Sequence, residues 1–564
     1  MGLFINLYFQ PKCTQEEWEK VWNECHNLLM KYPVPLMRID KQKLDEDTKR
    51  FVLTRNLIAD AGKEEERWDV IGDWISRKYA ENFFLYKNLK QQTSSLSRSF
   101  PKDILWADEK ELDYINGNGI TLFDSKTQQY PYHLAILAVG ILFEHFFPNE
   151  SYIIGDIDDT QAEIMTKWIN SVTNYEVKMP ICFDAERLWN RLDSLYENKE
   201  LLISRFQTLY KGDEKKLFKI IVQNASNEIF INFLAKDLAE YSSLSQWGAK
   251  DILNSYLQQT KDLEGLINLV LKAQEKKLEK EKKEDIDEKE FSLEKLLKVL
   301  CNGFVTISLE DREPLDVFAQ KKGKLVTMQE TFTLLFSKMS GLPSDINFYM
   351  NKEDIINIFL KYEKYNEVSF RNTIEECEKK CYEELNNIKE IIELIDKKLE
   401  EDEKTENKKE QSKKSTDNKP WIPNDRILTP EEKYIFEQTD RQIVRHADVE
   451  ESTKIMGQII QRCLDEDKKS DKNYFLTNDR TDLIKKIYYG NHHNGFVLKE
   501  TAWEEIDKEQ DIAILQRLAI LASLQNSELT FWNWRMYIME NKELWKYLID
   551  CQEISSDITI DQKK

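Results

Sequence analysis

At 564 residues, the chain is long enough to form several independent hydrophobic cores. It contains only 16 glycines and 12 prolines, and this scarcity argues against a turn-rich all-β fold. The 102 acidic residues outnumber the 81 basic ones, which gives a net charge of −21. Such a surface repels nucleic-acid phosphates and anionic membranes, so we expect neither a nucleic-acid partner nor a membrane partner.

Cysteine usage and hydropathy together predict a cytoplasmic protein. The eight cysteines are scattered, and none forms the C-x-x-C pair typical of a zinc site or a redox motif. The opening residues MGLFINLYFQ lack the basic region and the small-residue cleavage site of a signal peptide. The most apolar run, Leu134 to Phe147, is shorter than the roughly 20 residues that a membrane-spanning helix needs.

The first 195 residues alternate between strand and helix patterns, which predicts a mixed α/β domain. The predicted elements are, in chain order, a strand at Leu3–Gln10, a helix capped by Thr14 and Glu17, strands at Leu36–Ile39 and Phe51–Arg55, an aromatic run at Trp68–Trp74, a turn at Asn116–Gly119 and a helix at His133–Phe147. The last of these is apolar nearly all round, so we expect it to be buried.

One segment of this domain gathers carboxylates at a single point. Asp156, Asp158 and Asp159 follow the apolar run Tyr152–Ile154 and precede an amphipathic helix predicted over Gln161–Val172. Clustered carboxylates are suitable ligands for Mg²⁺, but aspartate is also a preferred N-cap residue of helices. The segment therefore has two interpretations, a metal site and a helix cap.

The pattern Asp156-x-Asp158-x-Thr160 after an apolar strand resembles the first motif of haloacid-dehalogenase-type phosphatases. In that family the first aspartate accepts the phosphoryl group and binds Mg²⁺, and the second is the general acid and base. The resemblance implies that Asp156 would attack the substrate and that Asp158 would transfer the proton. It covers Tyr152 to Thr160 alone.

The helix cap is the favoured interpretation because the other parts of a phosphatase site are missing. Gly155 stands at a strand position of the motif, Gln161 replaces an apolar residue, and no later strand ends in Ser, Thr or an acidic pair. Glu176 and Lys178, beside a strand predicted near Val177–Phe183, give an E-x-K order that also occurs in Mg²⁺-dependent nucleases. Such triplets arise readily in a chain rich in Glu and Lys, so an ordinary surface pair is favoured.

Beyond residue 195, helical periodicity predominates. A helix capped by Asp184 closes the first domain. The predicted parts are a helical module at 196–275, a charged helix or linker at 276–290, a mostly helical module at 291–399, a disordered charged linker at 400–420 and a C-terminal helical domain at 421–564. No fixed repeat period is evident, so the sequence does not predict a helical repeat array.

The C-terminal domain carries the predicted interface residues. Its predicted elements are helices that start after Thr429 and at Thr501, a turn around His492 and His493, and an apolar helix at Ile512–Leu524. Near the end, Trp532 and Trp534 would lie on different faces of one helix, followed by Arg535. Trp and Arg are enriched in binding hot spots, so we predict that these three residues contact a partner.

The sequence thus predicts an α+β, predominantly helical fold, with an N-terminal mixed α/β domain followed by helical modules. We expect a non-enzymatic scaffold, adaptor or inhibitor that binds one or more proteins, with no catalytic residue, cofactor or metal. A basic partner would suit the acidic chain, as in an immunity-type or defence-associated protein. The alternative is a Mg²⁺-dependent phosphatase or nuclease-like hydrolase. In that case Asp156 and Asp158 would be catalytic, and Asp159 would join them as a metal ligand.

Overall fold

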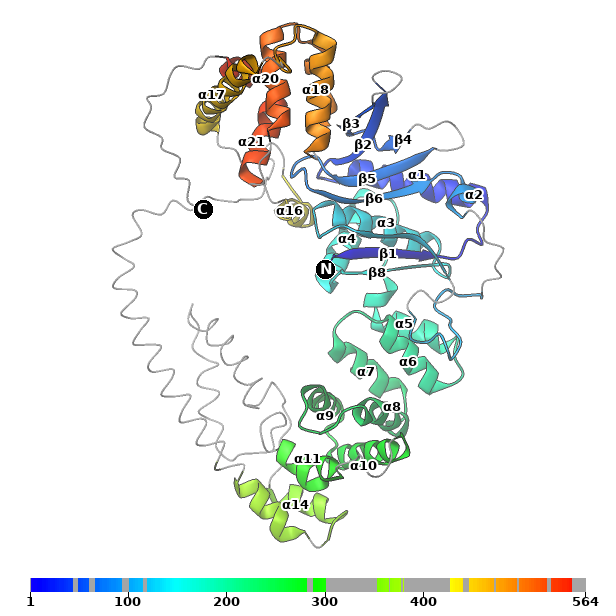
Figure 1. Ribbon diagram of the computed structural model, residues 1–564. Coiled ribbons are helices and arrows are strands. Elements are labelled where there is room, and N and C mark those ends of the chain that lie inside the picture. The colour runs from blue at the N-terminus through cyan, green and yellow to red at the C-terminus, as the bar shows by residue number, and fades with distance from the viewer. Residues whose placement is uncertain are drawn as a thin grey trace. The chain divides into compact units, whose positions relative to one another are not determined.

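The computed structural model has an α+β, mostly helical fold, as the sequence predicts (Figure 1). It describes residues 2–43, 49–59, 66–93, 101–114, 119–280, 288–300, 352–364, 366–376, 379, 427–439, 446–470, 473–494, 497–524 and 529–549. Within this part of the chain, none of the helices combines the length and the apolar character needed to cross a bilayer. The chain forms two compact units. Unit 1 comprises Met1–Leu105, Asn118–Pro180 and Asp417–Lys564, and unit 2 comprises Trp106–Gly117 and Ile181–Thr416.

The N-terminal part of unit 1 contains two sheets, whose strands pair antiparallel except for β3 with β9, and the helices α1 to α4. Its elements are β1 (Phe4–Phe9), α1 (Gln15–Lys31), β2 (Leu36–Lys43), β3 (Lys49–Thr54), β4 (Ile58–Ala59), β5 (Arg67–Asp73), β6 (Tyr79–Tyr86), α2 (Leu89–Gln92), β7 (Ile120–Lys126), α3 (Tyr132–Phe146), β8 (Ser151–Gly155) and α4 (Asp159–Val172). One sheet has the order β7-β1-β8, and the other has the order β4-β5-β2-β3-β9, with β6 also paired to β5. The predicted capping box of Thr14 and Glu17 starts α1.

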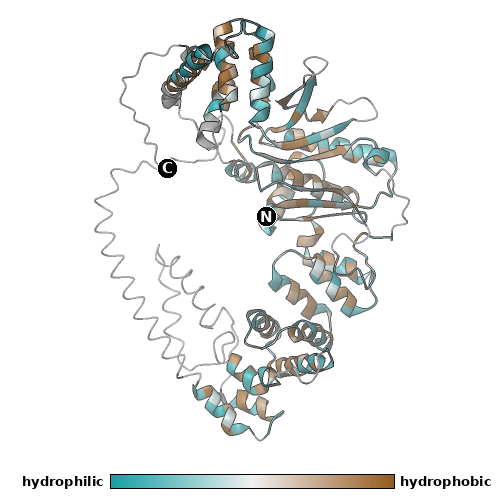
Figure 2. Cartoon of the chain, viewed as in Figure 1, coloured by the Kyte–Doolittle hydropathy of each residue, from teal (hydrophilic) through white to brown (hydrophobic). Residues whose placement is uncertain are grey.

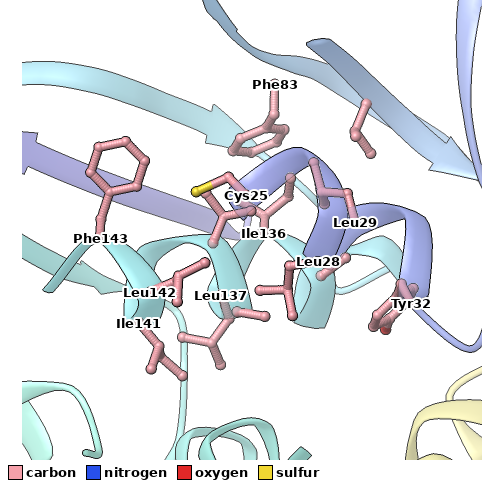
Figure 3. Close-up of a cluster of buried hydrophobic side chains, with 14 of the residues drawn as sticks. Cys25, Leu28, Leu29, Tyr32, Phe83, Ile136, Leu137, Ile141, Leu142 and Phe143 are labelled. Carbon is pink, nitrogen blue, oxygen red and sulfur yellow. The ribbon is translucent and has the colours of Figure 1, made fainter. Parts of the chain in front are cut away.

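Helix α3 is the centre of the hydrophobic core of unit 1. Every residue from Tyr132 to Phe143 is buried, as expected from its apolar sequence. Figure 3 shows Ile136 and Leu137 of α3 beside Cys25 and Leu28 of α1, with Phe83 of β6 close by. Burial of such side chains contributes roughly 1.5–3 kcal/mol each, so this contact is a major source of stability.

The C-terminal part of unit 1 is a group of helices with one short strand. Its elements are α16 (Pro430–Glu437), α17 (His446–Lys469), α18 (Arg480–His493), β9 (Leu498–Lys499), α19 (Glu500–Lys508), α20 (Ile512–Ser523), α21 (Leu529–Met539), α22 (Lys542–Trp545) and the 3₁₀ helix η4 (Lys546–Leu548). Helix α20 is apolar (Figure 2) and packs on α18. Helix α16 begins with the predicted capping box at Thr429. Strand β9 pairs in parallel with β3, at the register Val52 with Leu498.

Two arginines with largely buried side chains hold these two parts of unit 1 together. Arg50 forms a bidentate pair with Asp507 at 2.9 and 2.8 Å, and its guanidinium lies 4.8 Å from the centre of the Trp503 ring. Arg77 bonds Glu540 at 2.5 Å and the carbonyl of Val497 at 3.0 Å. The side chains of Arg77 and Glu540 are only 14% and 6% exposed. The planar, two-point pair of Arg50 with Asp507 fixes the orientation of the two side chains as well as the distance between them.

Three sequence predictions about local structure are wrong. Residues 177–183 form no strand, because the side chain of Asn170 binds both the N–H (2.7 Å) and the carbonyl (3.1 Å) of Val177 and so replaces a sheet partner. His492 and His493 form the last turn of α18 rather than a loop, where basic residues suit the helix dipole. Helix α19 begins at Glu500, not at Thr501, since Lys499 before it is held in β9.

Unit 2 is helical. Its elements are η1 (Ile181–Phe183), α5 (Ala185–Asp193), α6 (Lys199–Leu209), α7 (Glu214–Asn224), α8 (Asn227–Ala239), α9 (Trp247–Thr260), α10 (Leu263–Lys280), η2 (Glu288–Phe291), α11 (Leu293–Val299) and α14 (Lys352–Leu360). Asp184 caps α5 as predicted. The predicted turn at 116–119 and the predicted linker at 400–420 fall wholly or mainly outside the described residues, and the predicted domain boundaries stay predictions.

Unit 2 also includes a segment from upstream in the chain. The hydroxyl of Tyr196 accepts a hydrogen bond from the N–H of Ala107 (2.7 Å) and donates to its carbonyl (3.1 Å). The buried Arg205 donates to the carbonyls of Leu112 (3.0 Å) and Tyr114 (2.7 Å). These contacts fasten residues 107–114 to α6 and the loop before it.

Removing Glu540 should weaken unit 1. We expect Glu540→Ala to lower the free energy of unfolding by about 3 kcal/mol, because it leaves the buried Arg77 without its counter-charge. Denaturant unfolding of the full chain measures this change. As a control, Lys433→Ala removes an exposed pair with Glu437 at 3.9 Å and should cost about 0.5 kcal/mol at most. Equal losses in the two variants would contradict the prediction.

Candidate functional site

The carboxylate segment lies where two strands end and two helices begin. Strands β7 and β8 both pair antiparallel to β1, so their C-terminal ends lie on either side of the start of β1, near Phe4. Thr127 follows β7, Asp156 follows β8, and α3 and α4 start shortly after. Clusters of polar side chains at such strand ends are a common setting for ligand sites in α/β folds, so this edge is the first place to examine.

Asp156 is tied to the backbone of β1. Its Oδ2 accepts a hydrogen bond from the N–H of Phe4 at 2.6 Å, and its own N–H donates to the carbonyl of Phe4 at 2.8 Å. Gly155 before it has a φ of +152°, and a Cβ at this position would lie 2.4 Å from the Phe4 oxygen. Only glycine allows this close approach, which explains the strand-end glycine in the motif.

Asp158 is the N-cap of α4, as the favoured interpretation of the sequence predicts. Its Oδ1 accepts from the N–H of Gln161 at 2.8 Å, and the side chain of Gln161 accepts from the N–H of Asp158 at 3.3 Å, which completes a capping box. Asp159 lies in the first turn of the helix, where a negative charge interacts favourably with the dipole. The residue that seemed out of place in a phosphatase motif, Gln161, therefore has a defined structural role.

A buried histidine lies beneath this segment. His133 is 1% exposed, and its Nδ1 lies 2.6 Å from Oγ1 of Thr127. Burial lowers the pKa of His133 to about 4, although a hydrogen bond with Gln161 and the charges of Asp156 and Asp158 act in the opposite direction. The ring is therefore uncharged at neutral pH. This cluster could not be predicted from the sequence, because Gln161 lies beyond α3 and β8 from Thr127 and His133, and the three residues form no motif.

These contacts define what the site can do chemically. Asp156 and Asp158 are hydrogen-bonded to the backbone, and His133 is shielded from solvent, so the cluster joins the start of β1 to the starts of α3 and α4. In the described part of the chain, no three His, Cys, Asp or Glu side chains are grouped so that they could hold a metal ion. The alternative roles of Asp156, Asp158 and Asp159 in Mg²⁺-dependent hydrolysis stay predictions, with the test given below.

The predicted interface residues lie in α21. Arg535 is 1% exposed, and its Nη1 donates to the carbonyls of Leu524 and Leu521 at the C-terminal end of α20. Basic side chains commonly satisfy such terminal carbonyls. Trp534 is half-buried against the core of the C-terminal helices, and the side chain of Trp532 is outside the described residues. Arg535 thus has an internal role, and contact of these residues with a partner stays a prediction.

Comparisons with protein-family models, with curated proteins and with solved structures find no match to this chain.

Replacing Asp156 and Asp158 together by alanine tests the two interpretations of the segment. Loss of the helix cap should lower the free energy of unfolding by about 1 kcal/mol. We expect calorimetric titration of the wild-type chain with Mg²⁺ to give no saturable heat. A saturable heat that the double variant abolishes would contradict the structural interpretation and support the hydrolase alternative.

Replacing His133 by glutamine should flatten the dependence of stability on acid pH. Because the native pKa of about 4 lies below the usual 6.5, the unfolded chain takes up the proton first as the pH falls. The contribution of the neutral ring is therefore complete above pH 6.5. We expect about 3 kcal/mol to be lost as the pH falls to about 4. Urea unfolding of wild type and variant between pH 7 and pH 4 measures this difference. If the free energy of unfolding of the two proteins falls equally with pH, the prediction is refuted.

Asp73 provides a control, because its substitution should change the pH dependence of stability in the opposite direction to that of His133. Burial raises the pKa of Asp73 to about 6, against the opposing hydrogen bonds from Ser76 and Ile75. Its stabilising contribution is complete below the unfolded pKa of 3.8 and is lost as the pH rises to about 6. Asp73→Asn should therefore steepen the loss of stability on acidification, whereas His133→Gln should reduce it.

Proposed function

We propose that this chain is a non-enzymatic cytoplasmic scaffold, adaptor or inhibitor that acts by binding other proteins. The observation that carries the proposal is the arrangement of α5 to α10 in unit 2 (Figure 1). The main contacts among these six helices all join helices that are adjacent or next-but-one in the chain: α5 with α6 and α7, α6 with α8, α7 with α8 and α9, α8 with α9 and α10, and α9 with α10.

This contact pattern is that of stacked helical hairpins. The first helices of the pairs, α5, α7 and α9, contact one another in sequence, and so do the second helices, α6, α8 and α10. Each pair buries apolar side chains against the next, as Phe230 of α8 and Tyr256 of α9 do with ring centres 5.7 Å apart. Stacks of this kind present long, continuous surfaces that other proteins use for binding.

The surface of this array suits a protein partner. Acidic and basic residues balance over 181–280, whereas the whole chain carries −21. Mixed charges fix the register of a protein interface, and the net charge of the rest of the chain can speed association with a basic partner. An inhibitor of a basic toxin or nuclease would use both properties.

Affinity capture of the full chain from its native cells tests this proposal. We expect a stoichiometric protein partner that co-elutes with the chain in size-exclusion chromatography. Asp156→Ala with Asp158→Ala should leave the complex intact, because the array does not include these residues. Repeated recovery of the chain alone, under conditions that preserve other complexes, would overturn the proposal.

A further inference from the structure

We propose that the exposed face of α7 formed by Lys215, Lys216 and Lys219, here called the α7 lysine face, binds an acidic segment of a partner protein. This inference rests on the proposed function, because it assigns one part of the helical array as the recognition surface. It concerns a local charge whose sign is opposite to that of the whole chain.

Helix geometry places the three lysines together. Lys215 and Lys219 are about one turn apart, and Lys219 lies between Lys215 and Lys216 around the helix, so the three side chains share an arc of about 100°. All three are exposed, whereas Leu217, Phe218, Ile220 and Ile221 on the other sides of the helix are buried. The face is therefore one continuous basic stripe, on a helix about 16 Å long.

Lysines elsewhere in the array hold the helices together. Lys236 pairs with Glu200 at 3.2 Å, and Lys272 bonds Asn232 at 2.7 Å. The buried Lys277 donates to the carbonyls of Ala239 (3.4 Å) and Tyr241 (2.8 Å).

The α7 lysines differ from these three. The ammonium groups of Lys215, Lys216 and Lys219 form no ion pair with any residue that the structure describes. Since the array does not need their charges, they are available to an acidic ligand.

The surroundings favour a short acidic peptide over a nucleic acid. Helix α7 contacts α5 and α9, which carry exposed carboxylates at Glu186 and Asp251. Partial desolvation and the nearby charge of Asp251 raise the pKa of Glu214 at the start of α7. These acidic neighbours, together with the net charge of −21, repel a long polyanion, whereas a few extended acidic residues fit along a helix about 16 Å long.

Reversing two of the lysines tests the proposal. The probe is a fluorescent peptide with six consecutive glutamates, titrated with the full chain at low ionic strength. We expect Lys215→Glu with Lys219→Glu to weaken peptide binding at least tenfold, and added salt to weaken wild-type binding. Glutamate at position 215 lies in the first helical turn and suits the helix dipole, and position 219 is exposed, so the variant should keep its fold, which circular dichroism checks.

A matched variant controls for net charge. Lys298→Glu with Lys364→Glu makes the same charge change at exposed positions of unit 2 outside α5–α10. This variant should bind the peptide within twofold of wild type. Equal weakening in both variants, or tighter binding of single-stranded oligothymidine than of the peptide, would overturn the α7 assignment. Self-association of the wild-type chain that is lost in the Lys215→Glu with Lys219→Glu variant would also overturn the assignment.

Capture from native cells separates the two proposals. If wild type and the α7 variant recover the same partner equally, the proposed role of the α7 lysine face is refuted and the proposed binding function stands. If wild type recovers a partner and the α7 variant does not, both are supported. If wild type recovers none, the binding function itself fails.

Discussion

Close packing of α3 against β8 is the contact on which the rest of unit 1 depends. A Cβ at Gly140 of α3 would lie 2.3 Å from Cδ1 of Ile153, so the helix can approach the strand this closely only because position 140 has no side chain. Helices α1 and α4 both contact α3, and β8 leads directly to Asp156. The position of the carboxylate segment therefore follows from the close packing of the α3 backbone at Gly140 against the apolar side chain of Ile153.

The two units use charged residues in different ways. In unit 1, an ion pair such as that of Arg77 with Glu540 is shielded from solvent and fixes one arrangement of distant segments. In unit 2, Lys236 and Lys272 connect neighbouring helices near the surface, while the lysines of α7 remain in solvent. The first pattern stabilises a fold at the cost of adaptability, and the second leaves a charged surface that can respond to a partner.

Sequence patterns predicted the elements whose causes are local. The capping boxes at Thr14 and Thr429 and the buried helix α3 depend on residues within a few positions of one another, and they were predicted correctly. The strand predicted near Val177 failed because one asparagine side chain satisfied its backbone. The His133 cluster and the helical array depend on residues far apart, or on helix pairs of unequal length, so no motif or fixed period could indicate them.

The pairing of β3 with β9 has a consequence for synthesis of the chain. Arg50 and Asp507 are 457 residues apart, so the ribosome must translate most of the protein before the edge of β3 acquires its partner. At typical rates of 5–20 residues per second, this interval lasts on the order of tens of seconds. During that time an unpaired strand edge is open to wrong pairing. The nascent chain is therefore exposed to wrong pairing at β3 until β9 has been synthesised.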